Sequence, residues 1–152
     1  MKNKVDKKTK GVAITLIVVA SLLIVFAFCG RYFNSFVKHI ANFFVGSFGM
    51  SFYGVMAAVI VFASFALVGK KVKVPAKYLV HFILLFVTVV LFVHTLTTQF
   101  LPRDNFANYA GYVYNYYSGV PTFGGIVFGS MAYALQSVLS LVGAIIVYVG
   151  LL

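Results

Sequence analysis

Acidic residues are scarce in this sequence, and so are the other residues that most enzymes use for chemistry. Only two of the 152 residues are acidic, Asp6 and Asp104, and the chain has one cysteine, Cys29, and three histidines. Paired acid and base catalysis therefore has almost no side chains to use, and we expect that the chain is not an enzyme. A single cysteine cannot form a disulfide within the chain, so the redox compartment stays open.

Motifs for nucleotide and metal binding are missing as well. Lys70 and Lys71 follow a glycine, but the upstream glycine and the hydroxyl residue of a phosphate-binding loop are not there. His81 and His94 are thirteen residues apart, which is about 20 Å along a helix and on different faces, so they cannot share a metal. We therefore expect no catalytic, cofactor-binding or metal site, and we expect both histidines to be interface or interhelical hydrogen-bond partners.

Hydrophobic residues are abundant instead. They make up 62% of the chain, only 9% is charged, and the mean hydropathy is +1.04. A soluble domain is about half apolar and about a quarter charged, so this composition excludes an ordinary soluble domain. Four stretches each reach the roughly 20 residues that a helix needs to cross a bilayer. We predict an all-α integral membrane protein with four transmembrane helices, at about 11–29, 48–68, 78–97 and 123–152.

The first and last of these spans have unusual features. The first is longer than the apolar part of a secretory signal peptide, so we expect an uncleaved anchor rather than a leader. The last is uncharged from 122 to 152, about 30 residues or roughly 45 Å, which exceeds the hydrocarbon thickness. We therefore expect it to tilt or to project from the membrane.

The distribution of lysine and arginine predicts the orientation. The basic tail 1–10 and the connection between the second and third spans hold nine lysines, whereas the opposite side has three basic residues, Arg31, Lys38 and Arg103. Short connections rich in lysine stay in the cytoplasm. We predict both termini in the cytoplasm, with 30–47 and 97–122 outside. We interpret the lysines as retention charges that also meet anionic lipid headgroups, in preference to a nucleic-acid surface.

Two connections between the spans are patterned. Residues 33–44 predict an amphipathic helix in the outer membrane interface, and the alternative is that this helix extends the second span or packs on the bundle. The apolar side chains of its stripe are Phe33, Phe36, Val37, Ile40 and Phe44. The connection 97–122 holds five of the ten tyrosines, Tyr109, Tyr112, Tyr114, Tyr116 and Tyr117. We expect them at headgroup level as an aromatic belt, and a sugar-binding platform is the sharper alternative.

Small residues and one amide form a stripe along the fourth span. At about 100° per residue, a spacing of three or four residues keeps them on one face of a helix. The members are Gly125, Gly129, Ala132, Gln136, Ser140 and Gly143. We predict a packing face, on which Gln136 hydrogen-bonds a serine or a backbone carbonyl of the second span. The alternative is that the glycines reflect only the tolerance of membrane helices for glycine.

The segment from about Ile40 to Leu152 resembles the N-terminal four-helix membrane domain of the FtsK/SpoIIIE family of bacterial DNA translocases. Residues 40–67, IANFFVGSFGMSFYGVMAAVIVFASFAL, precede a short basic connection and Pro75 and are similar to the second span of the family. Residues 124–129, GGIVFG, lead into AYALQSVLSLVGAIIVYVGLL and are similar to its glycine-rich fourth span.

The resemblance implies a function for the chain. In that family the membrane domain anchors the protein at the division septum of the bacterial cell membrane, and a separate cytoplasmic hexameric ATPase pumps double-stranded DNA. This chain lacks the motor and stops within apolar sequence at residues 149–152, so we expect a membrane domain cut from a longer translocase, and the alternative is a natural stand-alone relative. ATP and magnesium are then implied only for the absent motor, and this chain needs no cofactor.

The expected partners follow from the same resemblance. They are the lipid bilayer, other copies of the protein through the absent motor, and other cell-division membrane proteins, without direct DNA contact. The alternative function is a small four-helix transporter or channel component. Its pathway would have only a thin polar lining, from Gln136, His94, Thr88 and several serines, and no span carries a glutamate.

Overall fold

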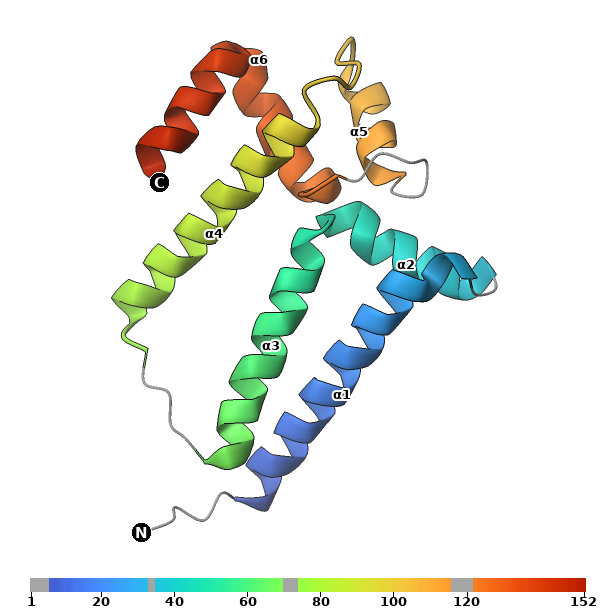
Figure 1. Ribbon diagram of the computed structural model, residues 1–152, viewed down its shortest axis with the longest axis vertical. Helices are drawn as coiled ribbons and strands as arrows, with labels where there is room; N and C mark the ends of the chain where they lie inside the picture. The colour runs from blue at the N-terminus through green and yellow to red at the C-terminus, as the bar shows by residue number, and fades with distance from the viewer. Residues whose placement is uncertain (1–5, 33–34, 70–73, 116–121) are drawn as a thin grey trace.

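The computed structural model describes residues 6–32, 35–69, 74–115 and 122–152. Within these ranges it has six α-helices, one short 3-10 helix and no strand (Figure 1). The elements are α1 Lys7–Cys29, η1 Gly30–Tyr32, α2 Ser35–Phe48, α3 Ser51–Val68, α4 Ala76–Thr97, α5 Phe106–Tyr114 and α6 Gly125–Leu151. Several residues of the sequence interpretation lie outside the described ranges: Lys2, Lys4, Phe33, Lys70, Lys71, Lys73, Tyr116 and Tyr117.

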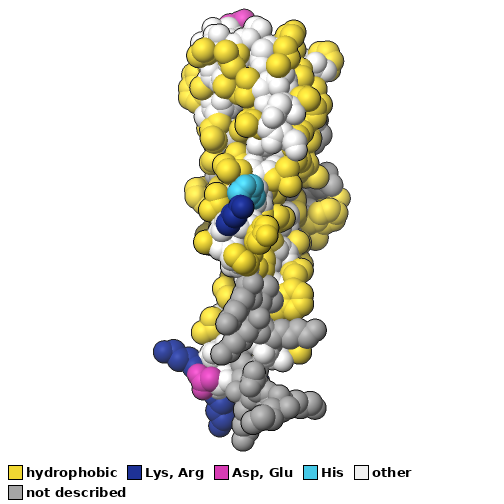
Figure 2. All heavy atoms as spheres, turned by 90° about the vertical axis from the view of Figure 1, so that its left-hand side faces the viewer, with side chains coloured by type: hydrophobic (Ala, Val, Ile, Leu, Met, Phe, Trp, Pro, Cys, Tyr) yellow, Lys and Arg dark blue, Asp and Glu magenta, His cyan; other side chains and the backbone are white. Residues whose placement is uncertain are grey.

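Four of the helices, α1, α3, α4 and α6, are long and apolar enough to cross a membrane. Large hydrophobic side chains are exposed on all four, for example Leu22, Phe62, Phe82 and Ile146. Figure 2 shows one face of the molecule, and hydrophobic side chains greatly outnumber charged ones in its upper part. Such continuous apolar surface is unfavourable in water and favourable against lipid tails. The prediction of an all-α multi-pass membrane protein is confirmed at this level.

Alanines hold α1 against α3. Ala13, Ala20 and Ala27 are buried at a spacing of seven residues, and Ala63 of α3 is buried as well. Seven residues are close to two helical turns, so the three alanines of α1 share one face. Their small side chains let the two helices approach closely, which gives the dispersion contacts that associate helices in a membrane. Figure 1 shows α1 and α3 side by side over most of their length.

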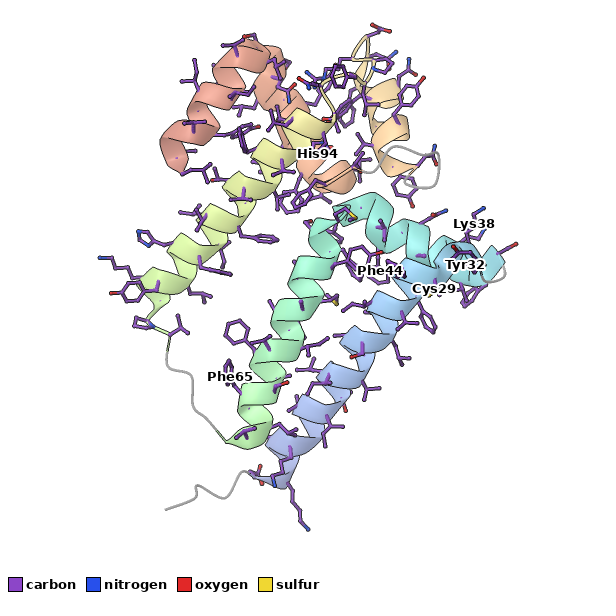
Figure 3. All side chains as sticks on the ribbon, in the orientation of Figure 1. Cys29, Tyr32, Lys38, Phe44, Phe65 and His94 are labelled. Carbon is purple, nitrogen blue, oxygen red and sulfur yellow. The ribbon has the colours of Figure 1, made fainter. Side chains whose placement is uncertain are left out.

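The helix α2 lies across one end of this pair. Val45 of α2, Ala27 of α1 and Phe52 of α3 form a buried cluster, with Phe44 packed against it. Figure 3 shows Phe44 directed toward α1 and α3, whereas Lys38 points away from them. The predicted helix between the first two spans is therefore present. Its expected apolar stripe is only partly covered, because Val37 and Ile40 are half-buried while Phe36 is exposed.

A close backbone crossing joins α2 and α3 to the start of α6. The sequence interpretation began the second span at 48, but Gly49, with φ +61°, separates α2 from α3. The N–H groups of Met50 and Ser51 donate to the carbonyl oxygens of Thr122 (3.2 Å) and Phe123 (2.9 Å). A Cβ on Gly49 would lie 2.5 Å from the Gly125 nitrogen. Only glycine therefore fits at this crossing.

The helix α6 turns back at Ser140, where the backbone has φ 62° and ψ 173°. Gln136 contacts Thr95 of α4, and Tyr148 packs its ring on Phe92 with centroids 6.4 Å apart. Twelve residues of straight helix would separate Gln136 from Tyr148 by about 18 Å, yet they meet adjacent turns of α4. The length of roughly 45 Å assumed one straight helix, and the break at Ser140 divides that helix into two segments. Figure 1 shows its last part returning beside α4.

Candidate functional site

The most polar part of the described spans is buried where α4, α5 and α6 meet. His94, near the end of α4, has no exposed surface. Its Nδ1 accepts a hydrogen bond from the N–H of Gly124 at 3.0 Å. A neutral imidazole that accepts at Nδ1 carries its proton on Nε2, and that nitrogen lies 2.9 Å from the hydroxyl oxygen of Tyr109. His94 therefore donates to Tyr109 and links all three elements (Figure 3).

The hydrogen bonds continue through Thr98, the residue that caps the end of α4. The hydroxyl of Tyr109 hydrogen-bonds the side chain of Thr98, whose own hydroxyl donates to the carbonyl of His94 at 2.7 Å. The Nη2 of Arg103 donates to the carbonyl oxygen of Thr98 at 3.2 Å. The hydrogen bonds among His94, Tyr109 and Thr98 form a closed ring, so these three side chains satisfy each other.

Burial also affects the titration of Tyr109. Loss of hydration raises the pKa of its hydroxyl above the ordinary value, because the phenolate is the charged form. The hydrogen bond with Thr98 and the charge of Arg103 oppose this increase in the pKa without reversing it. Tyr109 is therefore neutral at physiological pH and keeps the proton that it donates to Thr98.

A second interhelical hydrogen bond lies next to this ring. Nε2 of Gln136 in α6 donates to Oγ1 of Thr95 in α4 at 3.0 Å. The sequence interpretation placed the partner of Gln136 in the second span, which is wrong: the first half of α6 packs on α4, not on α3. We refer to His94, Thr95, Thr98, Tyr109 and Gln136 as the His94 cluster.

Glycines make room for the ring of His94. A Cβ on Gly129 would lie 3.0 Å from Nε2 of His94 and 3.1 Å from Val113 of α5. A Cβ on Gly124 would lie 3.1 Å from Nδ1 of the same ring. Aromatic rings cover the other side, because Tyr133 lies 5.2 Å from Tyr109 between ring centroids. The imidazole is thus enclosed by backbone on one side and by aromatic side chains on the other.

The predicted stripe on the fourth span divides at the break in α6. Gly125, Gly129, Ala132 and Gln136 are buried. Ser140 is exposed and Gly143 is half-buried. The prediction that all six residues share one helical face assumed an unbroken helix. The non-helical backbone at Ser140 interrupts the regular 100° rotation per residue on which that prediction depended. The first four members and the last two therefore lie on separate helical segments.

The two histidines have different environments. His94 has the interhelical role that we expected of it. His81 is exposed, and its Nδ1 pairs with the Lys77 carbonyl of its own helix at 2.7 Å. Within the described residues, no three His, Cys, Asp or Glu side chains lie close enough to hold a metal ion.

Sequence reasoning missed α5 and the burial of Tyr109. We expected Tyr109 in an exposed belt, but it is 1% exposed, because its hydroxyl finds a partner in His94. Tyr112 in the same helix is exposed and remains compatible with a belt. The signal for α5 was Asn105, whose side chain accepts from the N–H of Asn108 at 2.8 Å and caps the helix.

Three buried polar atoms of this region have no partner among the described residues. They are Nε of Arg103, Oε1 of Gln136 and the hydroxyl of Tyr148. The last two belong to α6, one on each side of its break. The hydrogen bonds of the His94 cluster join α4 to α5 and to α6, so its geometry is that of a network that locks these helices together.

The fold and the His94 cluster together define a class: a multi-pass, all-helical membrane protein in which a buried polar network locks α4, α5 and α6 together. Comparison with models of known protein families, with curated proteins and with solved structures found no match.

Proposed function

We propose that this chain is a non-catalytic membrane anchor and septum-targeting domain of a DNA translocase that acts in chromosome partitioning and cell division. One observation carries the anchor part of the proposal: the most polar side chains of the spans form hydrogen bonds within the protein. His94 and Gln136 bond within the cluster, and the hydroxyl of Thr88 donates to the Leu84 carbonyl of its own helix. These are the side chains that a pathway would need to present to solvent.

The DNA-translocase part rests on the resemblance of residues 40–152 to the FtsK/SpoIIIE membrane domain. In this proposal both termini lie in the cytoplasm of a bacterial cell, where a motor attached to the chain would reach the chromosome. ATP, magnesium and hexameric assembly belong to that motor. The expected partners are other cell-division membrane proteins, which would contact the exposed faces of the membrane-spanning helices.

A fluorescent fusion to the N-terminus of the chain tests the targeting. In a dividing rod-shaped bacterium, we expect the fusion to concentrate at the septum. A fusion that carries only α1 is the matched control for membrane insertion, and we expect it to spread evenly over the cell membrane. Even spreading of the whole chain would contradict septum targeting.

A small transporter or channel component is the second candidate, and the break in α6 favours it. Discontinuous helices line the substrate sites of many transporters, and Oε1 of Gln136 and the Tyr148 hydroxyl lie beside this break without a partner among the described residues. Flux of ions and small solutes into proteoliposomes separates the two candidates. An anchor gives the leak of empty liposomes, whereas flux that Gln136→Leu abolishes would establish a transport pathway.

A further inference from the structure

An open apolar groove lies between α1 and α3, away from the His94 cluster. Its volume is about 700 Å³. Lys8 and Thr9 line one end, and alanine, valine, leucine and phenylalanine side chains line the rest. The apolar residues are Val12, Ala13, Leu16, Val55, Ala58, Val59, Phe62, Ala63 and Ala66. The lining is therefore polar and cationic at one end of the groove and apolar along the rest.

The length of the groove matches one leaflet of a bilayer. On α1 it extends from Lys8 to Leu16, and on α3 from Val55 to Ala66. At 1.5 Å per residue these distances are about 12 Å and about 16 Å, and half of the hydrocarbon core is about 15 Å. The lining residues end at Leu16 on α1 and at Val55 on α3. A transmembrane helix from a second copy would need a groove about twice as long, so an acyl chain fits better.

The polar end has the charge that binds an anion. The ammonium group of Lys8 and the hydroxyl of Thr9 are both hydrogen-bond donors to phosphate oxygens. Lys7 and Lys10 belong to the same end of α1, and the sequence places three more lysines directly after α3, at 70, 71 and 73. Asp6 is the one acidic residue in the first hundred positions. This end of the groove therefore favours a lipid with net negative charge over a zwitterionic lipid.

We propose that the groove is a binding site for an anionic glycerophospholipid. One acyl chain lies in the open groove along the exposed side chains of Val12, Leu16 and Phe62, and the phosphate meets Lys8 and Thr9. This inference goes beyond anchoring, because it gives the membrane domain a preference for one class of lipid. A preference of this kind would make the anchor sensitive to the lipid composition of the membrane around it.

The absence of tryptophan from the sequence permits a clean test. Phe62→Trp places a single fluorophore in the groove, and Phe82→Trp places one on the exposed part of α4, where the side chain of Phe82 is 60% exposed. Each variant of the whole chain is reconstituted in vesicles of phosphatidylcholine and phosphatidylglycerol, of which one or the other is brominated on its acyl chains. We expect brominated phosphatidylglycerol to quench the groove reporter selectively and the α4 reporter without selectivity.

Lys8→Ala in the Phe62→Trp background tests the charge. One lysine near an anionic headgroup changes binding about five-fold, so we expect the selectivity to fall by about that factor. Lys77→Ala is the matched control, because Lys77 is exposed at the start of α4 and does not line the groove. We expect it to leave the selectivity unchanged.

Three outcomes would overturn the proposal, each in a different way. Equal quenching of the groove reporter by the two lipids means that the groove holds ordinary surrounding lipid. Quenching at position 82 but by neither lipid at position 62 means that protein covers the groove, as a second copy would. Quenching at neither position means that the chain is not inserted, which also refutes the membrane anchor.

Discussion

Replacing Gly125 by alanine should weaken the junction between the α1–α2–α3 part of the molecule and α6. The added Cβ would lie 2.5 Å from the Gly49 nitrogen, 2.5 Å from the Ser47 carbonyl carbon and 2.6 Å from the Phe48 nitrogen. These are backbone atoms, so no side chain can rotate away. Ordinary van der Waals contact begins near 3.4 Å, which means that the backbones must separate by about 0.9 Å, since interiors are close-packed.

The free-energy cost has two parts. Gly125 has φ +58°, and a left-handed conformation costs an alanine about 1 to 2 kcal/mol. Separation of the backbones also weakens the hydrogen bonds from Met50 and Ser51 to the segment before α6. Each such bond contributes about 0.5 to 1.5 kcal/mol. We therefore expect Gly125→Ala to lower the free energy of unfolding by about 2 to 5 kcal/mol.

Unfolding by denaturing detergent in mixed micelles, followed by circular dichroism, measures this change. Gly150→Ala is the matched control, because Gly150 also lies in α6 and a Cβ there has no atom within 4 Å. An exposed substitution of this kind changes stability by about 0.5 kcal/mol or less, apart from a small gain in helix propensity. Equal stability of the two variants would refute the crossing of Gly49 and Gly125.

Three further predictions concern the His94 cluster and the break in α6, all measured as thermal stability in detergent. His94→Ala leaves the buried N–H of Gly124 without a partner, at about 1 to 3 kcal/mol, and removes one of the two hydrogen bonds of the Tyr109 hydroxyl. His81→Ala on the exposed surface should have almost no effect, and similar losses for the two variants would contradict the structural role of the His94 imidazole. Ser140→Gly should stabilise the folded protein by about 1 to 3 kcal/mol, because only glycine readily adopts φ 62° with ψ 173°. A loss of stability in this variant would argue for a straight helix. Gly129→Leu should destabilise the folded protein far more than Val127→Leu. A Cβ at position 129 already crowds the His94 ring, whereas the side chain of Val127 is exposed.

Length and composition were enough to predict the four apolar helices, because a bilayer imposes a minimum length that few soluble helices reach. Helix ends were also predictable where the chemistry is local. Gly69 ends α3 in a left-handed conformation with φ 79°, as expected from its position before a basic connection. Pro75 immediately precedes α4, where its lack of an N–H has no cost.

The sequence could not predict features that depend on contacts distant along the chain. The break in α6 has no proline to announce it, so a stripe calculated for a regular helix continued through Ser140. The burial of Tyr109 depends on His94, fifteen residues earlier, and an exposed belt is the usual place for a membrane tyrosine. The sequence interpretation placed Gly49 inside the second span and Gly125 on the stripe of the fourth, and the close approach of the two glycines is set only by the packed helices.

The orientation of the spans is the most direct test of the membrane anchor. Single cysteines are introduced in a Cys29→Ser background as Lys77→Cys, Asn105→Cys and Leu152→Cys, and intact cells are treated with a membrane-impermeant thiol reagent. The lysine and arginine asymmetry predicts labelling of position 105, which is exposed before α5, and protection of positions 77 and 152 until the cells are permeabilised. Labelling of position 152 in intact cells would show that α6 returns to the outer side, and labelling of position 77 without position 105 would invert the whole topology.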